Sequence, residues 1–126
     1  MSLPVNARIQ AAQTFLANVQ SVHKFMREQD NSTADARYSA LLAQLKEARG
    51  LLRWNPTAGR PARFLASHSA QGQALAVRAK AIATAEGVPE LRELVVKPYV
   101  LLYAHSSDRV VLLALKHERE LIFQLS

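Results

Sequence analysis

The sequence predicts an α+β fold of two layers, in which an N-terminal helical hairpin packs on a C-terminal antiparallel β-sheet of three to four strands. Apolar residues recur at intervals of three and four in the first half of the chain, which is the spacing of an amphipathic helix. Short apolar runs separated by turn residues fill the last third and are typical of strands. An alanine-rich stretch between these halves predicts an extra, inserted helix over about 69–85.

The helical hairpin is predicted from two apolar stripes, each on one helix face. Ser32 or Thr33 is expected to cap the second helix. Asp35 would then lie in its first turn, at the positive end of the dipole. Pro56 should end this helix near Trp54, because proline lacks an N–H and disfavours a helical residue before it. The two stripes are Ala12, Phe15, Leu16, Val19, Val22 and Met26, and then Ala34, Tyr38, Leu41, Leu42, Leu45, Ala48 and Leu52.

The segment before the first helix is ambiguous. Val5, Ala7 and Ile9 alternate with polar residues, which fits either a short strand or an early start of the helix. Gly87 and Pro89 follow the alanine-rich stretch and are expected to end the inserted helix, whose apolar stripe is weak. We therefore expect that helix to lie against the domain rather than at its centre.

Three strands are expected over 91–96, 99–104 and 110–115, and their short connections make them antiparallel neighbours. The middle run is apolar on both faces and should be the most buried. The last run leads directly into Lys116, His117, Glu118 and Arg119, and such a cluster of ionisable groups at a strand end is a common place for a functional site.

Composition limits the class of protein. The 126 residues suit a single domain over 1–126, and the absence of cysteine excludes disulfides, thiolate metal sites and cysteine nucleophiles. No apolar signal core and no run near 20 apolar residues is present, so we expect a cytoplasmic protein without membrane contact. The net charge of +6 favours a polyanionic partner, although the cations are scattered and also fit a solvated basic surface.

Five short motifs occur in an order that resembles the RelE/ParE toxin superfamily of type II toxin–antitoxin systems. The resemblance covers 12–63 and 91–123 and implies the same fold for the whole chain. Two departures are an insertion over about 64–90 and a weak first strand. The motifs are the helix hairpin, Asn55-Pro56 with Gly59-Arg60-Pro61, the Arg92-Glu93 pair, Pro98 to Tyr103, and Ala114 to Glu120.

The resemblance implies the toxic component of a plasmid-stabilisation module. Members inhibit growth either by ribosome-associated mRNA cleavage or by inhibition of DNA gyrase, and a small acidic antitoxin neutralises them. The antitoxin is expected to cover the hairpin and sheet and to link the toxin indirectly to operator DNA. No cofactor is implied. Whether the chain is an enzyme stays open; if it is, it would be a metal-independent endoribonuclease. The alternative is a non-toxic binding module that keeps the fold.

The candidate catalytic residues follow from what RNA cleavage by 2′-OH attack requires, namely a base, an acid and cations for the phosphate. His117 can act as acid or base, and Arg92 and Arg119 can hold the phosphate. We expect Arg92 and His117 to meet in one pocket if the strand registers allow it. Secondary candidates are Tyr103, Lys97 and Lys116.

Each candidate also has a structural interpretation. His117 can be a strand-end hydrogen-bonding residue, and Arg92 can simply form a pair across the sheet. Tyr99 and Tyr103 are more typical of core and sheet-edge packing. The remaining histidines have no partner at metal-ligand spacing, so no metal site is expected; they are His23, His68 and His105.

Overall fold

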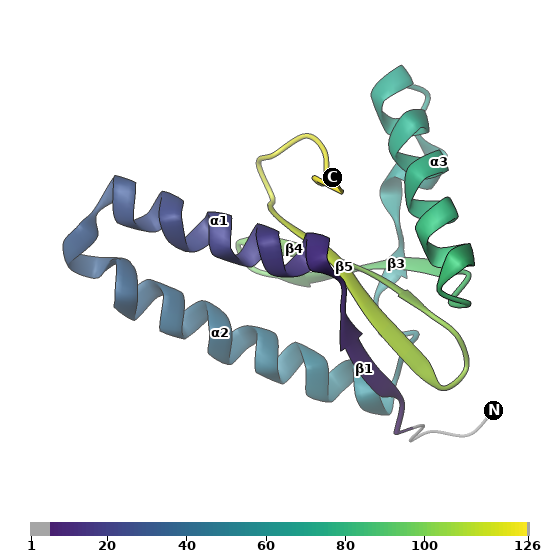
Figure 1. Cartoon of the computed structure of the whole chain (residues 1–126), viewed down its shortest axis with the longest axis horizontal. Helices are drawn as coiled ribbons and strands as arrows, with labels where there is room; N and C mark the ends of the chain where they lie inside the picture. The colour runs from purple at the N-terminus through teal and green to yellow at the C-terminus, as the bar shows by residue number, and fades with distance from the viewer. Residues whose placement is uncertain (1–5, 126) are drawn as a thin grey trace.

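A computed structural model describes residues 6–125 (Figure 1), and Val5 of the alternating pattern lies outside them. The short N-terminal pattern forms a strand rather than an early helix turn. The elements in chain order are β1 (Arg8–Ala11), α1 (Gln13–Gln29), α2 (Asn31–Trp54), β2 (Arg60–Pro61), the 3-10 helix η1 (Arg63–Ala66), α3 (Ala70–Ala85), β3 (Glu90–Val96), β4 (Tyr99–His105) and β5 (Arg109–His117).

The sheet is five-stranded and mixed, so the prediction of three to four antiparallel strands is wrong. The strand order is β1-β5-β4-β3-β2, with β1 parallel to β5 and the other neighbours antiparallel. The two unforeseen members, β1 with four residues and β2 with two, are too short to show a periodicity. Two parallel strands must be joined by a long crossover connection. Here the whole chain between β1 and β5 forms that connection.

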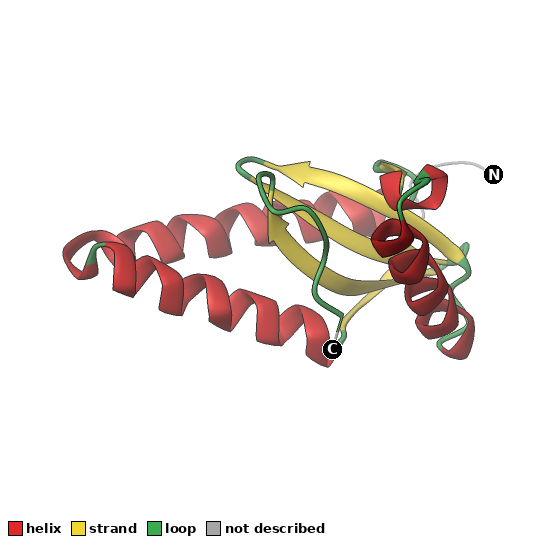
Figure 2. Ribbon diagram, turned by 90° about the horizontal axis from the view of Figure 1, so that it is seen from above, coloured by secondary structure: helices red, strands yellow, loops and turns green. Residues whose placement is uncertain are grey.

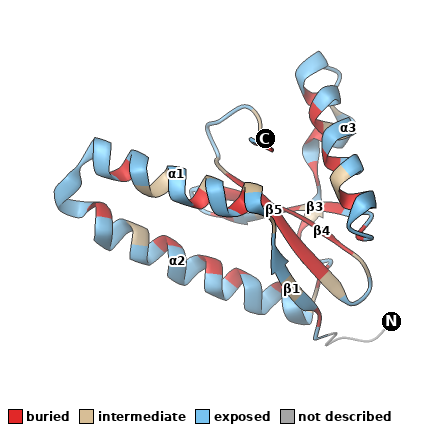
Figure 3. Ribbon diagram, viewed as in Figure 1, coloured by how far each residue is buried: buried red, intermediate tan, exposed pale blue. Residues whose placement is uncertain are grey.

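The sheet is covered on both faces, which the two-layer prediction did not include. The hairpin of α1 and α2 packs on one face, and α3, η1 and the C-terminal tail pack on the other (Figure 2). Every residue of β4 is buried between these two cores, as predicted for the middle run (Figure 3). The hairpin core includes Leu41, Leu52, Leu101, Tyr103 and Leu112. The second core includes Leu75, Val88, Leu102, Leu113 and Phe123.

The cap of α2 differs from the predicted one. Asp30, rather than Ser32 or Thr33, is the N-cap, and its Oδ1 accepts hydrogen bonds from the backbone N–H of Ser32 at 3.1 Å and from the Ser32 hydroxyl at 2.7 Å. These bonds lower the pKa of the Asp30 carboxyl. The first turn of α2 contains no acidic residue, and Asp35 contacts Nε2 of His23 at 3.3 Å instead. The helix ends at Trp54, as predicted.

The inserted helix α3 lies where the alanine-rich stretch predicted it. The Ser69 hydroxyl accepts the N–H of Gly72 at 3.0 Å and caps its start. Gly87, at a φ of 74°, ends it, and the following Val88 N–H returns to the carbonyl of Ala83 at 2.9 Å. The buried face of α3 is small, and it lies on the second core, which shields the outer face of β4 from water.

Candidate functional site

A β-bulge in β5 decides which face of the sheet each site residue occupies. Leu102 pairs with Ala114, but the next residue, Tyr103, pairs with Leu112, so Leu113 is an extra residue on β5. Leu113 and Ala114 therefore both lie in the second core, and the alternation is inverted beyond them. As a result, His117 lies on the hairpin face of the sheet.

On the hairpin face, His117 lines a cavity of about 730 Å³ that we call the His117 groove. It lies between α1, the first turns of α2 and the ends of β4 and β5. Its polar lining is Asn18, Ser21, Gln29, Arg37, Tyr99, His117, Arg119, Glu120 and Gln124, and its apolar lining is Ala17, Val22, Phe25, Pro98 and Leu115. The groove thus combines apolar lining residues with two arginines and one carboxylate.

The ring of His117 is held by local bonds. The backbone N–H of Arg119 donates to Nδ1 at 3.1 Å, so the proton of the neutral imidazole is on Nε2. The backbone N–H of His117 donates to Oε1 of Glu120 at 2.9 Å. The Tyr99 ring packs edge-to-face at 5.6 Å between centroids. Among residues 6–125 no group bonds Nε2, so the neutral ring offers a hydrogen-bond donor there rather than a lone pair.

Two guanidiniums reach the groove from segments far apart in the sequence. Arg119 follows β5 and is exposed, whereas Arg37 extends from α2 and donates to Oε1 of Gln29 at 3.1 Å. Arg37 was not predicted. No local sequence pattern indicates it; only the structure shows that Gln44, seven residues later on the same flank of α2, donates to the Lys97 carbonyl at 3.1 Å, so this flank faces the β3–β4 turn.

Tyr99 closes one side of the groove as a neutral phenol. Burial raises the pKa of its hydroxyl, and the positive charge of Arg37 only partly opposes that rise. Tyr99 therefore keeps its proton at neutral pH. The Arg92 carried by β3 is not part of the groove.

Arg92 and His117 do not converge, so that prediction is wrong. Arg92 pairs with Tyr103 on β4, whereas His117 pairs with Tyr99. These two β4 positions are four residues, or about 13 Å, apart along the strand. Arg92 donates through Nε to Nε2 of His105 at 3.0 Å and through Nη1 to the Gly59 carbonyl at 2.9 Å. Its guanidinium therefore connects the sheet to the turn after α2.

The neighbouring Tyr103 has the same structural role. Its side chain is fully buried, its hydroxyl donates to the Pro56 carbonyl at 2.6 Å, and it accepts the Gly59 N–H at 2.9 Å. Burial raises the pKa of this hydroxyl, although the Gly59 hydrogen bond and the charge of Arg92 oppose the shift. Tyr103 thus fits the core-packing interpretation.

The two secondary lysines lie outside the groove. Lys116 faces the second core because of the bulge, where Nζ donates to the Glu120 carbonyl at 2.9 Å and lies 5.3 Å from the centroid of the Phe123 ring. Lys97 lies in the exposed turn between β3 and β4. Of the six candidates, the groove therefore contains only His117 and Arg119.

No group of three His, Asp or Glu side chains within residues 6–125 is arranged to hold a metal ion. In the same range, no helix is both long and apolar enough to cross a bilayer. No family model matches the sequence. No curated protein matches it at a significant level.

Proposed function

We propose that this chain is the toxic component of a type II toxin–antitoxin module and that it stops growth by binding a protein target rather than by cleaving RNA. The five motifs that resemble the RelE/ParE superfamily support the toxin assignment, and DNA gyrase is the target in the branch that acts by binding. One observation carries the choice between mechanisms: Arg92 and Tyr103 are used inside the fold, away from His117.

The chemistry of the groove supports binding. Cleavage by 2′-OH attack needs a group that takes a proton from the hydroxyl. Neutral His117 presents an N–H at Nε2, because Nδ1 accepts the Arg119 N–H. Tyr99 retains its proton, since burial raises the pKa of its hydroxyl. Donors and cations of this kind suit an acidic partner surface better than proton abstraction.

The same groove suits neutralisation by an antitoxin. Val22, Phe25 and Leu115 belong to its apolar lining, and Arg37 and Arg119 add positive charge. An acidic amphipathic segment has the complementary pattern, with apolar anchors on one side and carboxylates on the other. Occupation of the groove by such a segment would block the target-binding surface.

Cleavage of mRNA at the ribosome is the second candidate function. The observation that favours it is the presence of His117, Arg119 and Arg37 in one groove, where the Nε2–H of the imidazole and two guanidiniums can meet a phosphate. In that mechanism Glu120 is the only carboxylate in the lining that is placed to act as a base. Its Oε1 already accepts the backbone N–H of His117.

Regulated expression of the chain alone tests the proposal. We expect growth to stop, plasmid DNA to lose negative supercoiling and mRNA to remain intact, and the purified protein should inhibit gyrase supercoiling in vitro. Arg119→Ala and Arg37→Ala should weaken both effects, whereas Lys24→Ala, an exposed cation on α1, should not. Fragmented mRNA with normal supercoiling would replace the proposal by the second candidate. Normal growth would identify a non-toxic binding module.

A further inference from the structure

One face of α2 carries a row of exposed cations. Lys46, Arg49 and Arg53 are separated by three and four residues, so they share a helix face, and all three are exposed. With a rise of 1.5 Å per residue, neighbours are about 4.5 Å and 6 Å apart along the axis. The ion pairs within residues 6–125 are His23–Asp35, Arg60–Glu93 and Arg109–Glu86, so none of them involves the row.

The carboxylates of α2 do not compensate this row. The helix has two, Asp35 and Glu47. Asp35 is engaged with His23 at 3.3 Å. Glu47 is rotated by about 100° around the helix from Lys46, because successive residues turn by that angle, and it lies further still from the faces of the two arginines. The row therefore projects positive charge into solvent.

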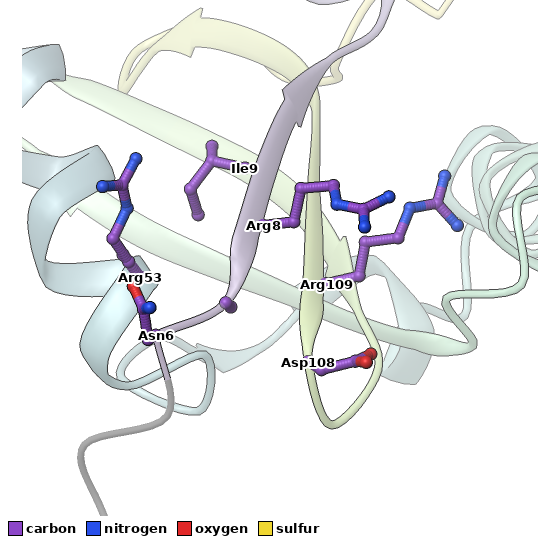
Figure 4. Close-up of a pocket in the computed structure, with 7 residues that line it drawn as sticks. Asn6, Arg8, Ile9, Arg53, Asp108 and Arg109 are labelled. Atoms are coloured by element: carbon purple, nitrogen blue, oxygen red, sulfur yellow. The ribbon is translucent and has the colours of Figure 1, made fainter.

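The row ends at a cavity of about 530 Å³ beside the N-terminal end of β1. Figure 4 shows Arg53 reaching from α2 on one flank of β1, while Arg8 and Arg109 extend from the other flank. Arg109 is engaged, because it donates to Gln10 and Glu86. The guanidinium of Arg8 has no hydrogen-bond partner in the described part of the chain. Since β1 is an edge strand, a long ligand can cross it and meet both flanks.

We propose that Lys46, Arg49, Arg53 and Arg8 form a surface that binds the phosphodiester backbone of nucleic acid. The row extends over about 10 Å of helix, which suits a chain of phosphates rather than one small anion. Arginine forks bind phosphate oxygens in a bidentate manner, and the net charge of +6 steers a polyanion toward the protein. The row lies on an open helix face without an enclosed pocket, and Lys46, Arg49 and Arg53 form a continuous line of cations along it, which suits an extended phosphate backbone better than an anchored side chain.

This surface is distinct from the His117 groove and does not depend on the proposed function. The cavity lies at Arg109, where β5 begins, and the groove lies at His117, where β5 ends. Val110, next to Arg109, and His117 pair with His105 and Tyr99, which lie six residues, or about 20 Å, apart on β4. One molecule can therefore bind nucleic acid at one end of β5 and a protein partner at the other.

The test measures binding of the full chain to a labelled duplex DNA of about 20 base pairs, by fluorescence anisotropy between about 50 and 200 mM salt. Each phosphate contact contributes about −0.9 to the slope of log K against log salt for duplex DNA and about −0.7 for single strands. We expect Arg53→Ala to reduce the slope by about 0.9 and the triple variant Lys46→Ala/Arg49→Ala/Arg53→Ala by about 2.7. A single-stranded RNA of equal length shows which form binds more tightly.

Two variants make the test specific. Asp108, the carboxylate in the cavity lining, repels phosphate, so Asp108→Asn should increase the affinity. Lys24→Ala removes an exposed charge elsewhere and should leave the slope unchanged. A wild-type slope in the triple variant would overturn the proposal, as would an equal loss in Lys24→Ala. Tight binding of a poly-glutamate peptide that the triple variant also loses would replace nucleic acid by an acidic protein.

Discussion

The hydroxyl of Tyr103 accepts the backbone N–H of Gly59 at 2.9 Å, 44 residues away in the sequence, and donates to the Pro56 carbonyl at 2.6 Å. One phenol on β4 thus satisfies two polar groups of the turn that follows α2. The junction between this turn and the sheet therefore depends on buried polar contacts.

Tyr103→Phe should destabilise the protein. The substitution leaves the Gly59 N–H and the Pro56 carbonyl buried without their partner, which costs about 1–3 kcal/mol. Urea unfolding followed by circular dichroism measures the free energy of unfolding. Tyr99→Phe is the matched control, because the Tyr99 hydroxyl makes no hydrogen bond within the described residues, and a similar loss there would contradict the assignment.

Alkaline pH should weaken the same junction. Burial raises the pKa of Tyr103 above its ordinary value of 10.0 in the folded state. The contribution of this phenol to stability is therefore fully present below about pH 10 and is lost as pH rises through the folded pKa. We expect the free energy of unfolding to fall more steeply in the wild type than in Tyr103→Phe as pH rises above about 10. Parallel curves would refute this role, since Tyr99 contributes equally to both proteins.

Gly59→Ala should be destabilising for steric reasons. A Cβ at Gly59 would lie 2.4 Å from the Glu93 carbonyl oxygen and 2.8 Å from Oη of Tyr103, so the backbone of β3 would have to move. Overpacking of this kind costs about 1–3 kcal/mol. Gly50→Ala is the control with the opposite sign, because a Cβ at this position of α2 would meet no neighbouring group within 4 Å and alanine is favoured in a helix by about 1 kcal/mol. Thermal melting of both variants measures the difference.

Glu93 should be needed to hold the segment after β2. Its buried carboxylate accepts Nε and Nη2 of Arg60 at 3.2 Å through Oε1, and the Arg63 N–H at 3.1 Å through Oε2. Glu93→Gln removes the charge and replaces one acceptor oxygen by an NH2 group that faces another donor. We expect this to cost about 1–3 kcal/mol. The cost is not larger because Arg60 is partly exposed and solvent screens the ion pair. Glu90→Gln, at an exposed position on the same strand, should change the urea midpoint little. An equal shift in both variants would show that the buried contacts contribute nothing.

Asp30 should stabilise α2 in a pH-dependent manner. The hydrogen bonds from Ser32 lower the pKa of Asp30 from its ordinary value of 3.8, so its contribution is present above that value and is lost as pH falls through the folded pKa. Asp30→Ala should lower the melting temperature at neutral pH, and the deficit should shrink in strong acid, where the wild-type carboxyl loses its charge. Asp30→Asn keeps a capping oxygen without the charge, so at neutral pH it should melt between the wild type and Asp30→Ala. A melting-temperature deficit in Asp30→Ala that is as large in strong acid as at neutral pH would contradict the assignment.

Much of the local structure was predictable from the sequence. The strands expected over 99–104 and 110–115 became β4 and β5 with their ends moved by one or two residues. The end of α2 at Trp54 and the position of α3 also agree with the prediction. These features follow from side-chain periodicity, proline and glycine, which act over a few neighbouring residues. The cap at Asp30 was missed because several polar residues in a row can all act as caps.

The candidate site was less predictable. His117 and Arg119 were recognised as a cluster because they are close in sequence, and they do line one groove. Arg92 was expected to join them, but strand pairing places it opposite Tyr103. Arg37 enters the groove from α2, 80 residues before His117, and no local pattern indicates that contact. Strand register and the placement of α2 against the sheet depend on the whole fold. They decided that Arg92 lies outside the groove and that Arg37 lies inside it.

By itself the sequence determined the type and approximate length of most elements and the basic character of the surface. Only the tertiary structure decided that β1 joins the sheet in parallel beside β5 and that His117, rather than Lys116, faces the helical hairpin. The physical reason is the single extra residue at Leu113, which inverts the in–out alternation of β5 beyond it. A bulge depends on pairing with a strand elsewhere in the chain, so side-chain periodicity within β5 does not reveal it.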